Sequence, residues 1–242
     1  MRSGRPIWGS PEMAIELICL DADDTLWHNM RHFDATQAIF ADLLAPFADA
    51  GVSREQLTAI EIRNLKLYGY GAKSFTLSMI ETALELAGDK LTDRTIADIL
   101  AAGRQLLAHP VELFPGIEEA LDRLGSHARL VLVTKGDLLH QETKLAASGL
   151  GDRFSGVEIV SDKNADTYRR LFARHGVAPE QAVMAGDSLR SDVLPALSAG
   201  AFAAYVPHDI VWEHERADEP VGHERYRRLS HLAHLGDWIA TL

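Results

Sequence analysis

Cysteine is almost absent from this chain of 242 residues, whose one cysteine is Cys19. A single thiol excludes an internal disulfide and suits a reducing compartment, so we expect a cytoplasmic protein with Cys19 packed in the core. No apolar run reaches the roughly 20 residues of a membrane-spanning helix. Residues 1–12 lack the apolar centre of a signal peptide, so we expect a flexible tail over 1–13, with Met1 and Met13 both open as the native start.

A surplus of basic residues is absent as well. The chain has 24 Lys and Arg against 35 Asp and Glu, which gives a formal net charge of -11. This balance disfavours nucleic acid and anionic membranes as partners and leaves small molecules. With 47% hydrophobic residues, the chain is able to bury one sizeable core and a small second domain.

The chain does contain a cluster of acidic residues directly after an apolar segment. Residues 15–20 have the character of a buried strand, and they run directly into Asp21, Asp23, Asp24 and Thr25. Neighbouring carboxylates on a tight turn repel one another, so they need a cation, shared protons or backbone donors to persist. A divalent metal ion is one explanation, and ordinary capping between a strand and a helix is the other.

Three later segments repeat this layout. Apolar strands predicted at 129–133, 156–160 and 182–185 are each followed by polar residues, and helical patterns separate them. Alternating strands and helices predict an α/β fold with a doubly wound, Rossmann-like parallel sheet. The helical patterns cover residues 118–125, 138–149, 165–176 and 192–199, and we expect a further strand at 200–206 and a closing helix at 229–242.

Polar side chains gather at one edge of this predicted sheet, because the carboxyl ends of parallel strands meet there. We expect Mg2+ to be held at that edge by Asp21, Asp187 and the backbone carbonyl of Asp23. Asp192 would bind the ion directly or through water. The full set at this edge is Asp21, Asp23, Thr134, Lys135, Lys163, Asp187 and Asp192.

In this order, the segments resemble the four motifs of the haloacid dehalogenase superfamily hydrolases, in the branch with a helical cap inserted after the first strand. The resemblance extends over nearly the whole chain from Ile15 onward. Motif one corresponds to residues 21–26, motif two to Thr134, motif three to Lys163, and motif four to residues 186–188 with Asp192.

The same residues take definite roles in the hydrolysis of a phosphate ester. Asp21 attacks phosphorus and forms an aspartyl phosphate, which splits one hard step into two easier ones. Asp23 protonates the leaving alkoxide and then deprotonates the hydrolytic water. The Thr134 hydroxyl and the Lys135 amide hold phosphoryl oxygens, while the Lys163 ammonium stabilises their charge.

Asp23 also bears on the type of reaction within the family. The resemblance implies that dehalogenating members lack an acid at this position, because halide leaves without a proton. Members that cleave phosphonates also depart from the pattern here and use a cap lysine, for which Lys66 and Lys73 are the candidates. Asp23 therefore favours a phosphatase. A phosphomutase or other phosphoryl transferase would keep Asp23 and stays an alternative, as does a non-catalytic relative that binds a partner.

About a hundred residues separate the first two motifs, which is too long for a plain connection. Helical patterns fill this stretch and predict an inserted all-α cap over residues 29–108, which would exclude water and select the substrate. The catalytic core then consists of residues 1–28 and 109–242. The four amphipathic patterns lie at 33–47, 53–68, 74–86 and 92–108.

One break in the cap is a candidate for substrate binding. Tyr68, Tyr70 and Lys73 stand among glycines, where they either reach over the substrate or form a plain helix–helix turn. Trp27, next to motif one, either lines the entrance or packs in the hinge.

From the motifs together, we predict a phosphoric monoester hydrolase, a magnesium-dependent phosphatase of a small phosphorylated metabolite. The sequence indicates no oligomeric state.

Overall fold

Residues 14–242 are described by a computed structural model, so the expected tail over 1–13 and both candidate start residues, Met1 and Met13, lie outside the described residues. The described part forms a six-stranded sheet with the order β3-β2-β1-β4-β5-β6, in which all neighbouring strands are parallel. This confirms the doubly wound fold. The strands are β1 (Leu17–Leu20), β2 (Arg129–Lys135), β3 (Gly156–Val160), β4 (Ala182–Gly186), β5 (Phe202–Tyr205) and β6 (Tyr226–Arg228).

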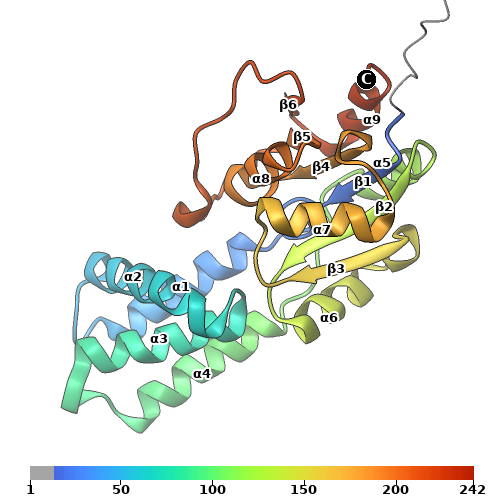
Figure 1. Ribbon diagram of the computed structural model, residues 1–242. Helices are drawn as coiled ribbons and strands as arrows, with labels where there is room; N and C mark the ends of the chain where they lie inside the picture. Colours follow the sequence, from blue (N-terminus) through green and yellow to red (C-terminus); the bar gives the residue numbers. More distant parts are fainter. Residues whose placement is uncertain (1–13) are drawn as a thin grey trace, which may run out of the picture.

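Both faces of the sheet are covered, which is why β1, β4 and β5 are almost wholly apolar. In β1, Ile18 and Leu20 point into one buried cluster, while Leu17 and Cys19 point into the other. Cys19 is fully buried, as the core interpretation requires. Helices α5 (Ile117–Gly125) and α9 (Leu235–Ile239) cover the first face, and α7 (Ala165–His175) and α8 (Leu194–Ser198) cover the second (Figure 1).

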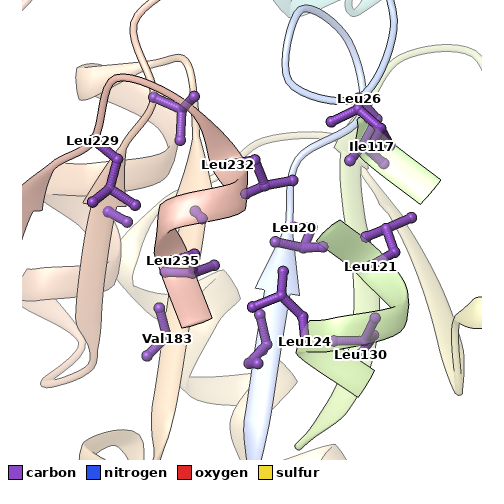
Figure 2. Close-up of a cluster of buried hydrophobic side chains, with 14 of the residues drawn as sticks. Leu20, Leu26, Ile117, Leu121, Leu124, Leu130, Val183, Leu229, Leu232 and Leu235 are labelled. Atoms are coloured by element: carbon purple, nitrogen blue, oxygen red, sulfur yellow. The ribbon is translucent and has the colours of Figure 1, made fainter. Parts of the chain in front are cut away.

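Leucines dominate the first of these clusters. Leu121 and Leu124 of α5 lie against Leu20 and Leu130 of the sheet, and Leu235 of α9 lies near Val183 (Figure 2). This packing fixes β1 at the centre of the sheet, between β2 and β4. From β1 the chain first adds β2 and β3 on one side and then β4, β5 and β6 on the other. The strand order therefore reverses beside β1, and ligands of such sheets bind at that point.

The chain after β4 departs from the expected pattern. The predicted helix at 192–199 begins instead with a π-helical turn, Leu189–Val193, because the backbone carbonyl of Ser188 accepts hydrogen bonds from both Asp192 and Val193. The expected closing helix at 229–242 was wrong in extent. A single-turn element, Leu232–His234, and the short α9 occupy that stretch, and the His231 side chain caps the turn by accepting from the Ala233 amide. Strand β6 was not predicted.

The first four α-helices after β1 form a separate unit with its own core (Figure 1). Where this unit joins the sheet, two chain segments lie side by side: the His28 amide donates to the Glu112 carbonyl, and the Phe114 amide donates to the Leu26 carbonyl, each at 3.0 Å. Assignment of residues 29–108 as a substrate-selecting cap stays a prediction. The helices are α1 (Met30–Leu44), α2 (Ala50–Tyr68), α3 (Ala72–Ala87) and α4 (Asp93–Leu107), and α6 (Leu138–Ser148) follows β2.

No helix within residues 14–242 has both the length and the apolar character that crossing a bilayer requires.

Candidate active site

The loop after β1 turns sharply and is held from several sides. The Asp21 amide donates to the Ala185 carbonyl at 2.9 Å, which ties the start of the loop to β4. Asp24 has a φ of 60°, a left-handed conformation that aspartate tolerates better than most residues. Its carboxylate accepts the amides of Asn29 and Met30. Because these amides open α1, Asp24 satisfies the helix end and explains why α1 begins three residues before the predicted start.

Three carboxylates from two strand ends converge at this loop. Oxygens of Asp21, Asp187 and Asp192 all lie within 4.8 Å of one another. The π-helical turn presents Asp192, whose second oxygen accepts the Ser188 amide at 3.0 Å. Gly186 leaves the space they need, because a Cβ at that position would clash with the Asp192 carboxylate and lie 2.9 Å from Asp21 Cβ.

A buried lysine partly neutralises this cluster. The Lys163 ammonium donates to Asp21 and, at 2.7 Å, to Asp192. Burial acts to lower the pKa of Lys163, but the carboxylates of Asp192 and Asp21 hold it above its usual value. Lys163 therefore stays charged, and one positive charge faces three acids.

The remaining negative charge perturbs the acids themselves. Burial, opposed by Lys163 and reinforced by Asp192, raises the pKa of Asp21 to about 7. Burial and the nearby Asp21 and Asp192 raise the pKa of Asp187 well above its usual range. A hard divalent cation with oxygen ligands fits this donor set, because it would stabilise all three carboxylates in their charged form.

Asp23 sits in a different setting from Asp21. Its carboxylate accepts two hydrogen bonds from Lys144 at 2.6 and 2.7 Å, one from Gln141 at 3.0 Å and one from the Trp27 indole at 2.7 Å. Burial acts to raise the pKa of Asp23, but the Lys144 ammonium and these other donors outweigh burial and lower that pKa. Trp27 is fully buried, so it is packed behind Asp23 rather than at an entrance.

Thr134 and Lys135 end β2 beside these acids. The Thr134 hydroxyl is buried and accepts from the Gln141 amide at 2.9 Å. The Lys135 ammonium donates to Ser191 at 2.8 Å and to Glu215 at 2.6 Å. The Lys135 side chain is therefore engaged in holding a later segment of the chain against the site.

One cavity of about 420 Å³ lies between the sheet edge and the four-helix unit, and it is bordered by Asp21, Asp23, Thr134, Lys135, Lys163, Asp187 and Asp192. This volume suits a small-molecule ligand. One wall comes from α1 and α2, a second from the Gly69 to Gly71 loop, and a third from residues 210–215 after β5. The helical unit contributes Phe33, Gln37, Arg54, Thr58, Glu61, Leu65, Tyr70 and Phe75, among others.

Of the three cap residues predicted to bind substrate, Tyr70 alone lines the main cavity. Tyr70 lines the main cavity, with its ring 3.9 Å below the Lys135 ammonium. Tyr68 is turned away and donates to Glu81 at 2.9 Å, and Lys73 pairs with Asp137 at 2.9 Å. Both line a second cavity beside the first, which Tyr70 borders as well.

Sequence reasoning missed three residues that contact the site: Gln141, Lys144 and Glu215. Gln141 and Lys144 are one turn apart on α6, and both are almost fully buried. No apolar pattern marks this face of α6, because Leu138 and Leu139 are exposed while His140, Gln141 and Lys144 are buried. Glu215 lies in an irregular segment, and no local pattern marks it.

Comparison with known proteins gives a consistent result. A model of the haloacid dehalogenase-like hydrolase family matches residues 15–200. The chain is similar to a phosphoserine phosphatase from Thermus thermophilus, with 27% identity over an alignment of 231 residues. The alignment covers 81% of this chain and 90% of the relative.

Solved structures extend the comparison to three dimensions. A haloacid dehalogenase-like family hydrolase from Xanthomonas campestris is 40% identical with a TM-score of 0.85, covering 98% of this chain and 95% of its own. A 2-haloacid dehalogenase from Pseudomonas syringae is 20% identical with a TM-score of 0.61, covering 94% of this chain and 99% of its own. The latter likeness shows the shared fold.

Proposed function

Because the chain belongs to the haloacid dehalogenase-like hydrolases, we propose that it is a magnesium-dependent phosphatase of small phosphate monoesters that works through a phosphoaspartyl intermediate on Asp21. One observation carries this proposal: Asp21 and Asp23 line one cavity, yet their surroundings shift their pKa values in opposite directions. Two acids in different electrostatic settings suit two different roles.

Asp21 is the nucleophile in this proposal. One of its carboxylate oxygens forms a bond to phosphorus while the bond between phosphorus and the ester oxygen breaks. The Asp21 backbone is fixed by its hydrogen bond to Ala185, and its side chain contacts Lys163 and Thr25. These contacts limit the directions in which the attacking oxygen can point, which favours a productive approach.

Asp23 moves the protons. The leaving ester oxygen takes a proton from Asp23, and Asp23 later accepts one from the water that attacks the phosphoaspartate and restores Asp21. Lys144 stabilises the carboxylate form of Asp23, which is the form that accepts the water's proton. A phosphate dianion beside Asp23 favours the protonated form, which is the form that the leaving oxygen requires.

Thr134 and Lys163 would stabilise the charge that gathers on the phosphoryl oxygens. Both side chains are buried, so their dipole and charge act in a medium that screens weakly. The Lys135 amide is a further donor at the same edge. The Lys135 ammonium has Glu215 as its partner and supports the cavity wall instead.

Asp21, Asp187, Asp192 and the backbone carbonyl of Asp23 would hold Mg2+. When bound, the ion offsets the repulsion between an anionic nucleophile and an anionic ester. Acids with raised pKa values and mutual distances of at most 4.8 Å support this assignment. Asp192 keeps Lys163 in place as well, so its loss would affect two functions at once.

Dehalogenation is the competing reaction, since proteins of the same fold include haloacid dehalogenases. A departing halide needs no proton, so a dehalogenase gains nothing from the acid at Asp23. The hydrogen bonds that orient Asp23 in the cavity therefore favour phosphate esters over haloacids. Transfer of the phosphoryl group to a second hydroxyl, as in a phosphomutase, would use the same residues.

The four-helix unit, residues 29–108, acts as the cap in this proposal. It covers the carboxylates of the core, and its apolar side chains Phe33 and Phe75 reduce the room for water in the cavity. Exclusion of water protects an acyl phosphate from wasteful side reactions.

A panel of phosphate monoesters, assayed with Mg2+ and again with EDTA, tests the proposal. We expect hydrolysis that requires Mg2+, no halide release from 2-chloropropionate, and a loss on the order of a thousandfold or more in Asp21→Asn. Asp89→Asn, an exposed aspartate on the helical unit, is the matched control and should retain full activity. Halide release, or turnover of Asp21→Asn within tenfold of the wild type, would contradict the proposal.

A further inference from the structure

Glu61 is a carboxylate of the cavity wall that the proposed chemistry does not use. It belongs to α2, where Arg54, Thr58, Glu61 and Leu65 all line the cavity at spacings of four, three and four residues. This spacing places them on one face of the helix. The Glu61 side chain is half-buried, so it is part of the wall and not of the outer surface.

No residue within 14–242 forms a hydrogen bond or an ion pair with the Glu61 carboxylate. The three lysines of the cavity have other anions: Lys135 pairs with Glu215, Lys144 with Asp23, and Lys163 with Asp21 and Asp192.

Other charges of the helical unit are also too far away or already paired. Arg63 forms ion pairs with Glu81 and Glu85. Arg54 is exposed and stands two turns from Glu61, roughly 10 Å along the helix axis. Among residues 14–242, therefore, no cation pairs with Glu61 where it faces the cavity.

A half-buried carboxylate without a partner is costly, and burial raises the pKa of Glu61 to about 8. The neighbouring wall is apolar at Leu65, Phe33 and Phe75, so a charge placed opposite Glu61 would be weakly screened. A ligand cation would remove the cost by supplying the missing charge.

We propose that Glu61 binds an ammonium group on the leaving-group side of the substrate, so that the preferred phosphate monoesters carry an amine. This inference rests on the proposed phosphatase activity. Core residues bind the phosphoryl group that all such esters share, so discrimination must come from cap residues such as Glu61 that face the variable part.

Two esters of equal size isolate the charge. Phosphoethanolamine ends in an ammonium where n-propyl phosphate ends in a methyl group. The measured quantity is the ratio of kcat/KM for phosphoethanolamine to kcat/KM for n-propyl phosphate, with Mg2+ present. The wild type should prefer phosphoethanolamine, and Glu61→Gln should lower the ratio roughly tenfold to hundredfold, since a charge-assisted hydrogen bond is lost.

Glu55→Gln is the matched control, because Glu55 is exposed on the same helix and does not line the cavity. It should keep the wild-type ratio, whereas Glu61→Gln should lose much more activity on phosphoethanolamine than on n-propyl phosphate.

An equal ratio in wild type and Glu61→Gln, or an equal loss on both esters, would overturn the inference. Failure of the proposed function is a distinct result, namely that no phosphate ester, p-nitrophenyl phosphate included, is hydrolysed by the wild type.

Discussion

The Lys144 ammonium lies 2.6 Å from one carboxylate oxygen of Asp23 and 2.7 Å from the other, across 121 positions of sequence. The lysine side chain is 5% exposed and that of Asp23 is 21% exposed, so water screens the pair weakly. The pair lowers the pKa of Asp23 and keeps it in the carboxylate form. This form suits the second half of the proposed reaction, in which water loses a proton.

Replacement of Lys144 by Met should raise the pKa of Asp23 by removing its nearest positive charge. With Asp23 as the base, the acidic limb of the kcat profile then moves to higher pH. Lys144→Arg keeps the charge and should move the limb less. Exposed Lys90→Met should leave the profile unchanged. A limb that stays in place in Lys144→Met would show that the pair is structural only.

A second buried pair, Lys135 with Glu215, predicts a pH-dependent stability. Although burial acts to raise it, Lys135 and the hydroxyls of Ser188 and Ser191 lower the pKa of Glu215 to about 2. Because the folded pKa lies below the unfolded value of 4.5, the stabilisation is complete above pH 4.5 and is lost as pH falls toward 2.

Urea unfolding of Glu215→Gln and wild type measures this stabilisation. At pH 7 the variant should have a free energy of unfolding lower by about 3 kcal/mol, from a shift of two to three pKa units. At pH 3 the difference should be much smaller. An equal difference at both pH values would mean that the charge of Glu215 does not stabilise the fold.

The site residues that the sequence could predict share one property, which is that they belong to the segments at the carboxyl ends of the strands. The end of a parallel strand has a known place in a doubly wound sheet, so Asp21, Thr134 and Asp187 could be brought together without coordinates. Lys144 and Glu215 could not, since a helix face and an irregular segment bring them to the site. Their positions depend on tertiary packing that local patterns do not encode.

The same limit explains the errors in the fold. A period of three to four residues predicted a regular helix from Asp192, but the Ser188 carbonyl accepts two amides and opens a π-helical turn. This turn carries Asp192, whose carboxylate lies within 4.8 Å of that of Asp21. Strand β6 is three residues long and mostly polar, so no apolar pattern marked it.

Proton competition should govern magnesium binding. Asp21, with a pKa of about 7, and Asp187, with a pKa well above its usual range, must both be ionised to hold the cation. Lowering the pH from 8 to 6 should therefore raise the Mg2+ concentration for half-maximal activity by roughly tenfold or more. Calorimetric binding of Mg2+ without substrate provides an independent reading. An activation constant that is the same at pH 6 and pH 8 would contradict the assignment.

Gly186→Ala tests whether the space between the acids matters. The added Cβ would clash with the Asp192 carboxylate and approach Asp21 Cβ to 2.9 Å, so the cluster has to separate. We expect weaker Mg2+ activation and a stability loss of about 1–3 kcal/mol from overpacking. Gly51→Ala is the control, because a Cβ there meets nothing within 4 Å. Wild-type activation by Mg2+ in Gly186→Ala would show that the acids tolerate a different spacing.

Tyr70 and Lys73 are close in sequence and both border the second cavity, but of the two only Tyr70 lines the main cavity, which allows a sharp test of the cap. The Tyr70 ring lies under the Lys135 ammonium and 6.2 Å from the ring of Trp212, so it joins the helical unit to the wall after β5. Tyr70→Ala should change the ranking of phosphate esters about tenfold, the scale of one lost contact of about 1.4 kcal/mol. Lys73→Ala removes an exposed ion pair with Asp137 and should leave the ranking unchanged. If Lys73→Ala changed the ranking and Tyr70→Ala did not, the substrate would extend into the second cavity, and specificity would be set by the face that carries Tyr68.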